Sequence, residues 1–170
     1  MDKRWIYILI MLIVGVALLA FIVDTSTTIG SATVSLSTYT DTLPDSFNIE
    51  TSKNDYAIFI NRKTNEKIYI GDLGKGNLTD KKFDEKVIEL KNDENVTDIN
   101  FTNEIYNNTS LKTIYYEKLP NNTINKASFF MKFNHTFIVD SYNYHDVNKI
   151  DEGAHFVIDT LKKDYKKSQD

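Results

Sequence analysis

Residues 127–142 read ASFFMKFNHTFIVDSY, and this stretch decides the fold class that the sequence predicts. Aromatic and β-branched residues run through it in a pattern typical of a β-strand with one buried face. A glycan on Asn134 would require that side chain to point outward. Because side chains alternate along a strand, Lys132 and Thr136 would then also point outward, and the odd-numbered residues between and around them would face the core. We therefore expect one long strand. Its predicted inward side chains are Phe129, Met131, Phe133, His135, Phe137 and Val139.

Shorter segments before this stretch also have strand character, and turn residues separate several of them. Two further segments have apolar residues at helical spacing, and these predict helices over residues 79–92 and 148–166. Short connections favour antiparallel pairing. We therefore predict an α+β domain, in which two helices pack on an antiparallel sheet of about six strands. The other predicted strands are residues 47–50, 56–61, 67–71, 97–106 and 111–119.

The predicted helices each have one apolar stripe. The expected stripe of the first is Phe83, Val87 and Leu90, with Thr79 or Asp80 as the N-terminal cap. The second helix closes the domain. Its expected sheet-facing residues are Ile150, Ala154, Val157, Leu161 and Tyr165.

Length and composition limit the class of protein. The chain has 170 residues, a net charge of −4 and no cysteine. A single domain fits this length beside an anchor. Nucleic-acid binding is not expected, because such proteins usually carry a basic surface. The lack of cysteine excludes disulfides, thiolate metal ligands and a cysteine nucleophile.

A run of 19 residues without a charge, Trp5–Val23, precedes the domain. About 20 apolar residues cross a bilayer as a helix. Lys3 and Arg4 before the run and Asp24 after it predict that residues 1–4 lie in the cytoplasm and that everything after residue 24 lies outside. A cleaved signal peptide is the alternative, although its apolar region is usually shorter. The Ser- and Thr-rich residues 24–42 then predict a stalk, with a first strand at its end as one alternative, and residues 43–170 form the extracytoplasmic domain.

Seven Asn-x-Ser/Thr sequences favour a glycosylated outer surface, in agreement with the direction of the anchor. The alternative is that a chain rich in Asn and Thr contains such sequences by accident. The adjacent Asn107 and Asn108 are not expected to be occupied together. The candidate residues are Asn77, Asn95, Asn100, Asn107, Asn108, Asn121 and Asn134.

Two patterns resemble sites but have simpler explanations. The three histidines, His135, His145 and His155, are spaced ten residues apart across a strand, a loop and a helix, and this spacing does not predict a shared metal site. The glycines of residues 71–77 do not match the phosphate-loop pattern and are explained as a turn before a helix. No metal or cofactor is therefore predicted.

The strongest candidate for a ligand site is the polar and aromatic stretch over residues 140–146. Tyr142, Tyr144 and His145 would line a pocket for a sugar or a flat ligand. The alternative is a connecting loop whose tyrosines close the edge of the core. No catalytic residue is predicted, since the sequence contains no recognisable catalytic constellation.

Three features carry a resemblance to known families: Leu43-Pro44-Asp45-Ser46-Phe47, the strand Lys112-Thr113-Ile114-Tyr115-Tyr116, and the amphipathic C-terminal helix. With the anchor and stalk, the chain resembles small uncharacterised surface proteins of methanogenic archaea. The order of elements after Leu43 resembles the PsbP-like fold. This resemblance implies a binding or accessory role and transfers no functional residue.

Two functions are expected from these observations. The first is a membrane-anchored module that binds an envelope protein or glycan without catalysis. The second is an extracytoplasmic domain that senses or binds a small molecule or a metal. The sequence does not indicate an oligomeric state.

Overall fold

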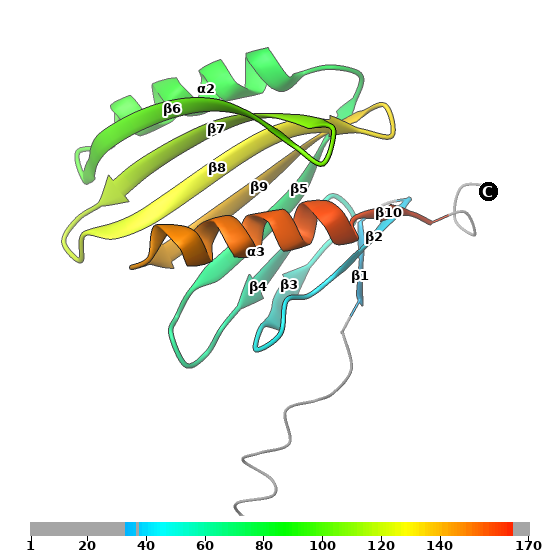
Figure 1. Cartoon of the computed structure of the whole chain (residues 1–170), viewed down its shortest axis with the longest axis horizontal. Helices are drawn as coiled ribbons and strands as arrows, with labels where there is room; N and C mark the ends of the chain where they lie inside the picture. Colours follow the sequence, from blue (N-terminus) through cyan, green and yellow to red (C-terminus); the bar gives the residue numbers. More distant parts are fainter. Residues whose placement is uncertain (1–32, 37, 165–170) are drawn as a thin grey trace, which may run out of the picture. The chain divides into compact units, whose positions relative to one another are not determined.

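The computed structural model describes residues 33–36 and 38–164, which form two sheets and two helices (Figure 1). The elements in chain order are β1 (Thr33–Leu36), β2 (Tyr39–Thr42), β3 (Asn48–Ser52), β4 (Tyr56–Ile60), β5 (Lys67–Lys75), α2 (Thr79–Lys91), β6 (Val96–Tyr106), β7 (Thr109–Lys118), β8 (Thr123–Lys132), β9 (His135–Tyr144), α3 (Val147–Thr160) and β10 (Lys162–Lys163).

The larger sheet has seven strands in the order β3-β4-β5-β9-β8-β7-β6, and every neighbouring pair is antiparallel. The prediction of an α+β fold with an antiparallel sheet is confirmed, but the number of strands is larger than the six expected. The additional strand arises because residues 127–142 form a hairpin and not one strand. Phe133 and Asn134 have φ angles of 53° and 62°, which form a two-residue turn between β8 and β9.

This turn changes which side chains face the core. Met131 and Phe133, predicted inward, are 47% and 43% exposed. Phe129 and Phe137 are both buried, but they belong to different clusters on opposite faces of the sheet. Thr136, predicted outward, is fully buried. The alternation predicted through residues 127–142 was therefore wrong across residues 131–136, since a turn restarts the alternation.

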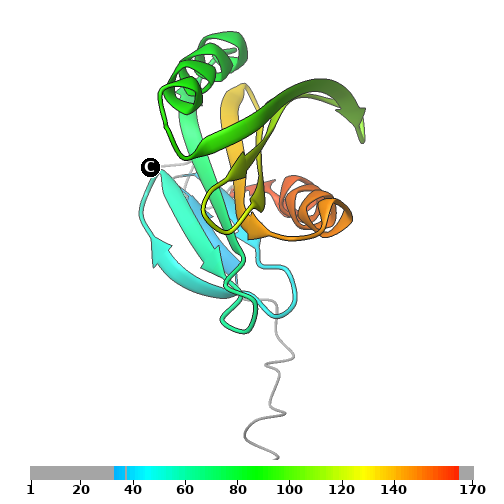
Figure 2. The same cartoon turned by 90° about the vertical axis from the view of Figure 1, so that its left-hand side faces the viewer.

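Each helix covers one face of the larger sheet (Figure 2). The predicted stripe of α2 is confirmed: Leu90 is buried, and Phe83 and Val87 pack against the same cluster. The buried face of α3 includes the predicted residues Ile150 and Val157. The sheet is thus apolar on both faces, which explains the nearly continuous apolar run in β9.

The smaller sheet has the order β1-β2-β10 and packs with α3. Val34, Leu36 and Tyr39 are buried in the same core as α3. These residues lie within 24–42, where the sequence predicted a stalk. The folded part of the chain therefore includes residues before Leu43, because an alternation of short apolar side chains is present among the serines and threonines.

The helix ends differ in detail from the prediction. The N-cap of α2 is Leu78, which makes no side-chain capping hydrogen bond, so the prediction of Thr79 or Asp80 as the cap was wrong. Helix α3 ends at Thr160, six residues earlier than expected, because Leu161 is extended and β10 follows it. Tyr165 lies outside the described residues.

No helix among the described residues is long and apolar enough to cross a membrane. The predicted anchor, Trp5–Val23, and the predicted cytoplasmic residues 1–4 lie outside the described part of the chain.

Candidate ligand-binding site

The structure separates the three residues predicted to form a pocket. Tyr142 is half-buried and lines a hollow beneath α2. Tyr144 is buried in the core beneath α3, where its hydroxyl has no hydrogen-bond partner among the described residues. His145 is exposed at the end of β9. The aromatic stretch therefore contributes one residue, Tyr142, to the hollow and one to the core.

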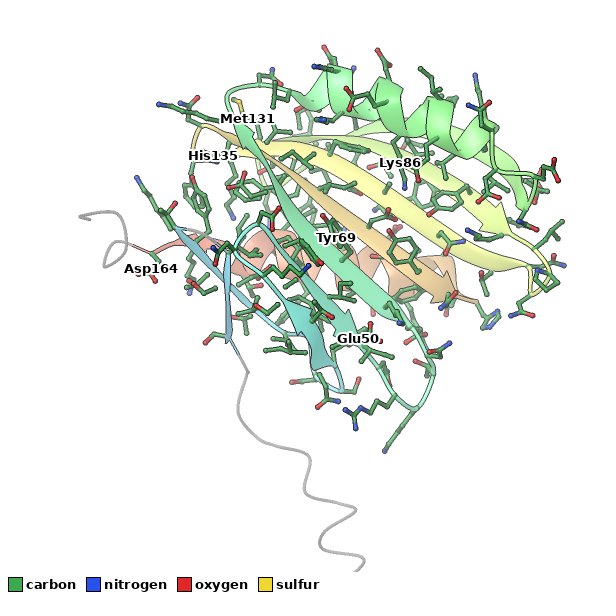
Figure 3. The ribbon with its side chains drawn as sticks, turned by 180° about the vertical axis from the view of Figure 1, so that it is seen from behind. Glu50, Tyr69, Lys86, Met131, His135 and Asp164 are labelled. Atoms are coloured by element: carbon green, nitrogen blue, oxygen red, sulfur yellow. The ribbon has the colours of Figure 1, made fainter. Side chains whose placement is uncertain are left out.

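The hollow beneath α2 is the candidate site. It has a volume of about 290 Å³ and lies between α2 and the strands β5, β8 and β9. Figure 3 shows this side of the sheet and labels Tyr69 and Lys86, which belong to opposite walls. Its lining residues are Tyr69, Leu73, Lys82, Glu85, Lys86, Glu89, Phe129, Ile138, Asp140 and Tyr142.

Asp140 is the innermost charged group of this hollow and is only 1% exposed. Its Oδ2 accepts a hydrogen bond from the Tyr142 hydroxyl at 2.6 Å and lies 3.5 Å from Nζ of Lys86. Among the described residues, no donor forms a hydrogen bond with its Oδ1. Burial raises the pKa of Asp140 to about 6, although Lys86 and Tyr142 oppose this shift.

Lys86 connects the helix to this buried carboxylate. Its Nζ lies 2.8 Å from Glu89 Oε1 and 3.5 Å from Asp140 Oδ2. Burial lowers the pKa of Lys86, but Asp140 and Glu89 together raise it above its ordinary value. Lys86 is therefore cationic at neutral pH and is shared between two carboxylates.

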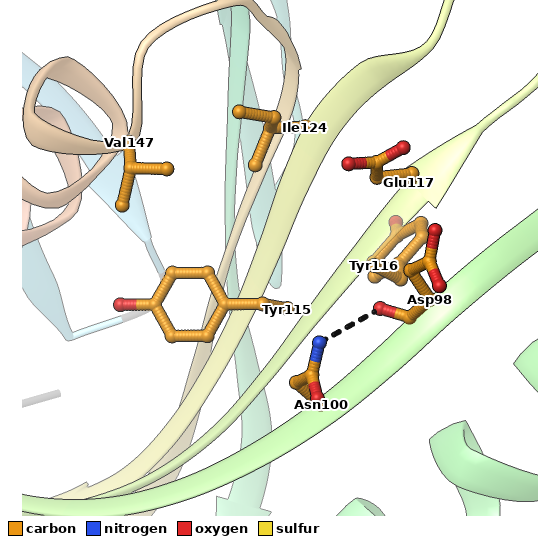
Figure 4. Close-up of a pocket in the computed structure, with 7 residues that line it drawn as sticks. All are labelled: Asp98, Asn100, Tyr115, Tyr116, Glu117, Ile124 and Val147. Atoms are coloured by element: carbon orange, nitrogen blue, oxygen red, sulfur yellow. Dashed lines mark hydrogen bonds between the residues drawn. The ribbon is translucent and has the colours of Figure 1, made fainter.

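A second hollow of about 290 Å³ lies at the start of β6 and β8 and the end of β7 (Figure 4). Tyr115, Ile124 and Val147 give it mainly apolar walls. Asn100 also lines it and donates to the carbonyl oxygen of Asp98 at 3.2 Å. Asn100 is one of the candidate glycosylation residues, and a glycan on it would occupy the mouth of this hollow. We therefore consider the hollow beneath α2 the better ligand site.

A charged network lies beneath α3, on the other face of the sheet. Lys126 is fully buried, and its Nζ lies 2.9 Å from Asp151 Oδ1 and 3.4 Å from Glu104 Oε1. The Tyr115 hydroxyl donates to the same Asp151 oxygen at 2.8 Å. Each charged group here has a partner of opposite charge among the described residues, so this network joins α3 to the sheet.

The histidines occupy separate environments. His135 Nδ1 lies 3.0 Å from both carboxylate oxygens of Asp72, whereas the ring of His155 stacks on Tyr106 with centroids 3.7 Å apart. His145 is exposed. Within the described residues, no group of three or more histidine, aspartate or glutamate side chains is arranged to hold a metal ion.

The glycine loop before α2 is occupied by contacts with the β8–β9 hairpin. The N–H of Gly76 donates to the Asn134 carbonyl oxygen at 2.9 Å, and the N–H of Leu78 donates to Thr136 Oγ1 at 2.8 Å. These two N–H groups are therefore not available to an anion. The interpretation of residues 71–77 as a turn was wrong for residues 71–75, which continue β5 and pair with β9.

All seven candidate glycosylation asparagines are exposed. Asn107, Asn108 and Asn134 lie in hairpin turns, and Asn121 lies in the turn between β7 and β8. Exposure is a requirement for glycosylation, and whether a glycan is attached stays a prediction.

Asp140 and Lys86 were not predicted as site residues, although the position of each in the sequence is unusual for a charged side chain. Asp140 continues the apolar run Phe137–Val139, so it is a charge within a strand that is buried on both faces. Lys86 lies three residues after Phe83 and four before Leu90, which places it on the apolar stripe of α2. A charged residue at such a position needs a buried partner, and each is the other's partner.

Comparisons with known proteins reveal similarity at the level of structure. No protein-family model and no curated protein sequence matches the chain. The solution structure of cyanobacterial PsbP (CyanoP) from Synechocystis sp. PCC 6803 is similar over 81% of this chain and 95% of that chain, with 14% identity and a TM-score of 0.49. A crystal structure from Bacteroides thetaiotaomicron VPI-5482 is similar over 79% of this chain and 48% of that chain, with 14% identity and a TM-score of 0.52.

These similarities concern the α+β fold alone. The PsbP-like fold expected from the sequence stays a prediction. This chain spans about half the length of the Bacteroides protein. The expected likeness to surface proteins of methanogenic archaea finds no support in these comparisons, and neither similarity transfers a site or a function.

Proposed function

We propose that this chain is a membrane-anchored module whose extracytoplasmic domain binds an envelope partner without catalysing a reaction. The charge-free run Trp5–Val23 supports the anchor, and Lys3 and Arg4 support a cytoplasmic N-terminus. The seven exposed asparagines of the glycosylation sequences are compatible with a domain on the outer side.

The exposed edge strand β6 is the observation that favours binding of a protein partner. It is the last strand of the larger sheet and pairs only with β7 among the described strands. Phe101 and Ile105 lie on the same side of β6 and are 50% and 82% exposed. A long edge strand with exposed apolar side chains is a surface that another chain can cover.

Cross-linking in native membranes, followed by purification and mass spectrometry, tests this proposal. Ile105→Lys should abolish recovery of a stoichiometric partner that the unaltered chain retains. Ile49→Lys is a matched control, because Ile49 is an exposed isoleucine on β3, at the opposite edge of the sheet. Absence of a stoichiometric partner, or equal recovery with both variants, would count against the proposal.

A second candidate function is binding or sensing of a small molecule, and the hollow beneath α2 favours it. The buried Asp140 and the aromatic residues Tyr69, Phe129 and Tyr142 combine apolar walls with a few polar groups, as small-molecule sites do. The full chain in detergent micelles should then show a higher melting temperature with a ligand. No shift across a broad panel of small molecules would contradict this candidate.

A further inference from the structure

The carboxylate of Asp140 has one oxygen that no described residue satisfies. Tyr142 and Lys86 both approach Oδ2, at 2.6 Å and 3.5 Å, and Oδ1 has no hydrogen-bond partner in the described part of the chain. Buried polar atoms in folded proteins are nearly always hydrogen-bonded. Asp140 lines the hollow beneath α2, so a donor that enters the hollow would approach this carboxylate.

The charges that line the hollow do not balance. Lys82 pairs with Glu85 at 2.7 Å, and Lys86 pairs with Glu89 at 2.8 Å. Lys86 also lies 3.5 Å from Asp140, so it is shared between two carboxylates. The lining as a whole has two lysines and three carboxylates, which gives it a net charge of −1. A ligand with one positive charge would neutralise the site, whereas an anion would add to the imbalance.

The walls indicate what kind of cation fits. Tyr69, Phe129 and Tyr142 contribute aromatic rings to the lining, and Leu73 and Ile138 contribute apolar side chains. Aromatic rings attract organic cations through their faces. A hydrated metal ion would instead need several oxygen or nitrogen ligands, and the described residues contain no such cluster.

We propose that the hollow beneath α2 binds a small organic ammonium ion, which donates a hydrogen bond to Oδ1 of Asp140 and packs against the aromatic walls. The volume of about 290 Å³ is at the lower end of small-molecule sites, which span roughly 300–1,000 Å³, so the ligand is compact. This inference rests on the second candidate function and does not require the protein partner of β6.

Calorimetric titration of the full chain in detergent micelles tests the proposal. The probes are butylammonium and benzylammonium, each compared with its neutral counterpart, butanol and benzyl alcohol. We expect saturable binding of at least one ammonium ion and at least tenfold weaker binding of the corresponding alcohol. Because this comparison uses the unaltered chain, it remains decisive even if a variant fails to fold.

Asp140→Asn removes the negative charge with little change in shape and should weaken ammonium binding at least tenfold. Glu152→Gln is the matched control, since Glu152 is an exposed carboxylate on α3 and should leave binding unchanged. Binding that is equal for ammonium ions and alcohols, or unchanged in a folded Asp140→Asn variant, would overturn the proposal. Absence of binding by both ammonium ions would also overturn it, without affecting the cross-linking test of β6.

Discussion

The Nζ of Lys126 lies 2.9 Å from Oδ1 of Asp151 and thereby joins strand β8 to helix α3. The lysine is fully buried, whereas the side chains of Asp151 and Glu104 are 32% exposed. The cation also lies 5.2 Å from the centre of the Tyr115 ring. The buried ammonium group of Lys126 thus contacts the carboxylates of Asp151 and Glu104 and the ring of Tyr115 beneath α3.

Replacement of Lys126 by methionine should lower the free energy of unfolding by about 3 kcal/mol. This is the lower end of the range for breaking a buried ion pair, because the two carboxylates left behind are partly hydrated. Urea unfolding of the full chain in micelles, followed by circular dichroism, measures the change. Lys149→Met is the control and should have little effect, since Lys149 is exposed on α3. A similar loss in both variants would show that the pairing does not matter.

Stability should rise as the pH falls from about 8 to about 5. Burial raises the pKa of Asp41 to about 7 and that of Asp140 to about 6, so the folded chain binds protons in this range that the unfolded chain does not. The cost of the two buried charges is full above these values and disappears toward the unfolded pKa near 4. Urea midpoints across this pH range measure the trend, and midpoints that fall as the pH falls would contradict it.

Asp41→Asn should remove part of this pH dependence and stabilise the chain at pH 8 by about 1–3 kcal/mol, since each pKa unit corresponds to about 1.4 kcal/mol. Asparagine retains a side-chain oxygen that can accept from the Thr160 hydroxyl and the Thr42 N–H, which now donate to Asp41 Oδ1 at 2.6 Å and 2.7 Å. Asp45→Asn is the control, because Asp45 is exposed. An unchanged pH profile in Asp41→Asn would show that Asp41 is not a source of the trend.

A fragment of residues 32–170 should fold, whereas a fragment of residues 43–170 should not. The shorter fragment lacks β1 and β2, and with them the buried side chains of Val34, Leu36 and Tyr39. Each such side chain contributes about 1.5–3 kcal/mol on burial, so their combined loss is comparable to the stability of a typical domain. Thermal unfolding by circular dichroism distinguishes the two. A cooperative transition in the shorter fragment would show that the smaller sheet is dispensable.

Asn134→Gly should remove a glycan, if Asn134 carries one, without loss of stability. Asn134 has a φ angle of 62°, which glycine adopts without strain. Asn134→Gln also removes the acceptor but should lower stability, because glutamine tolerates this conformation less well. Electrophoretic mobility reports the glycan and the melting temperature reports the turn. Equal melting temperatures for both variants would contradict the assignment of residues 133–134 as the turn.

The sequence predicted the strands β3–β7 and both helices because alternation and helical spacing persist through them. It did not reveal the turn within residues 127–142, because Phe133 occupies a positive-φ position that aromatic residues rarely adopt. Strands β1, β2 and β10 were harder still. Lys162 and Lys163 are exposed, and only their backbone pairing with Tyr39 and Thr40 makes them a strand.

The candidate site could be predicted only in part. Tyr142 was identified from the aromatic stretch, but Lys86, which lines the same hollow, is distant in sequence and reaches it only because α2 packs on the sheet. Alternation and helical spacing in the sequence predict which way a side chain points, but they do not predict which helix or strand will pack against it. For the same reason Tyr144, two residues further on, was grouped with Tyr142, although the two belong to different sides of the sheet.

The pairing of β2 with β10 has a consequence for the order of events during synthesis. Lys162 and Lys163 pair with Thr40 and Tyr39, and the N–H of Asp164 donates to the Thr38 carbonyl oxygen at 2.7 Å. Strand β2 leaves the ribosome early but cannot pair with β10 until β10 has been synthesised. Until about residue 164 has emerged, β2 has an open edge, so the smaller sheet can be completed only after α3 has been translated.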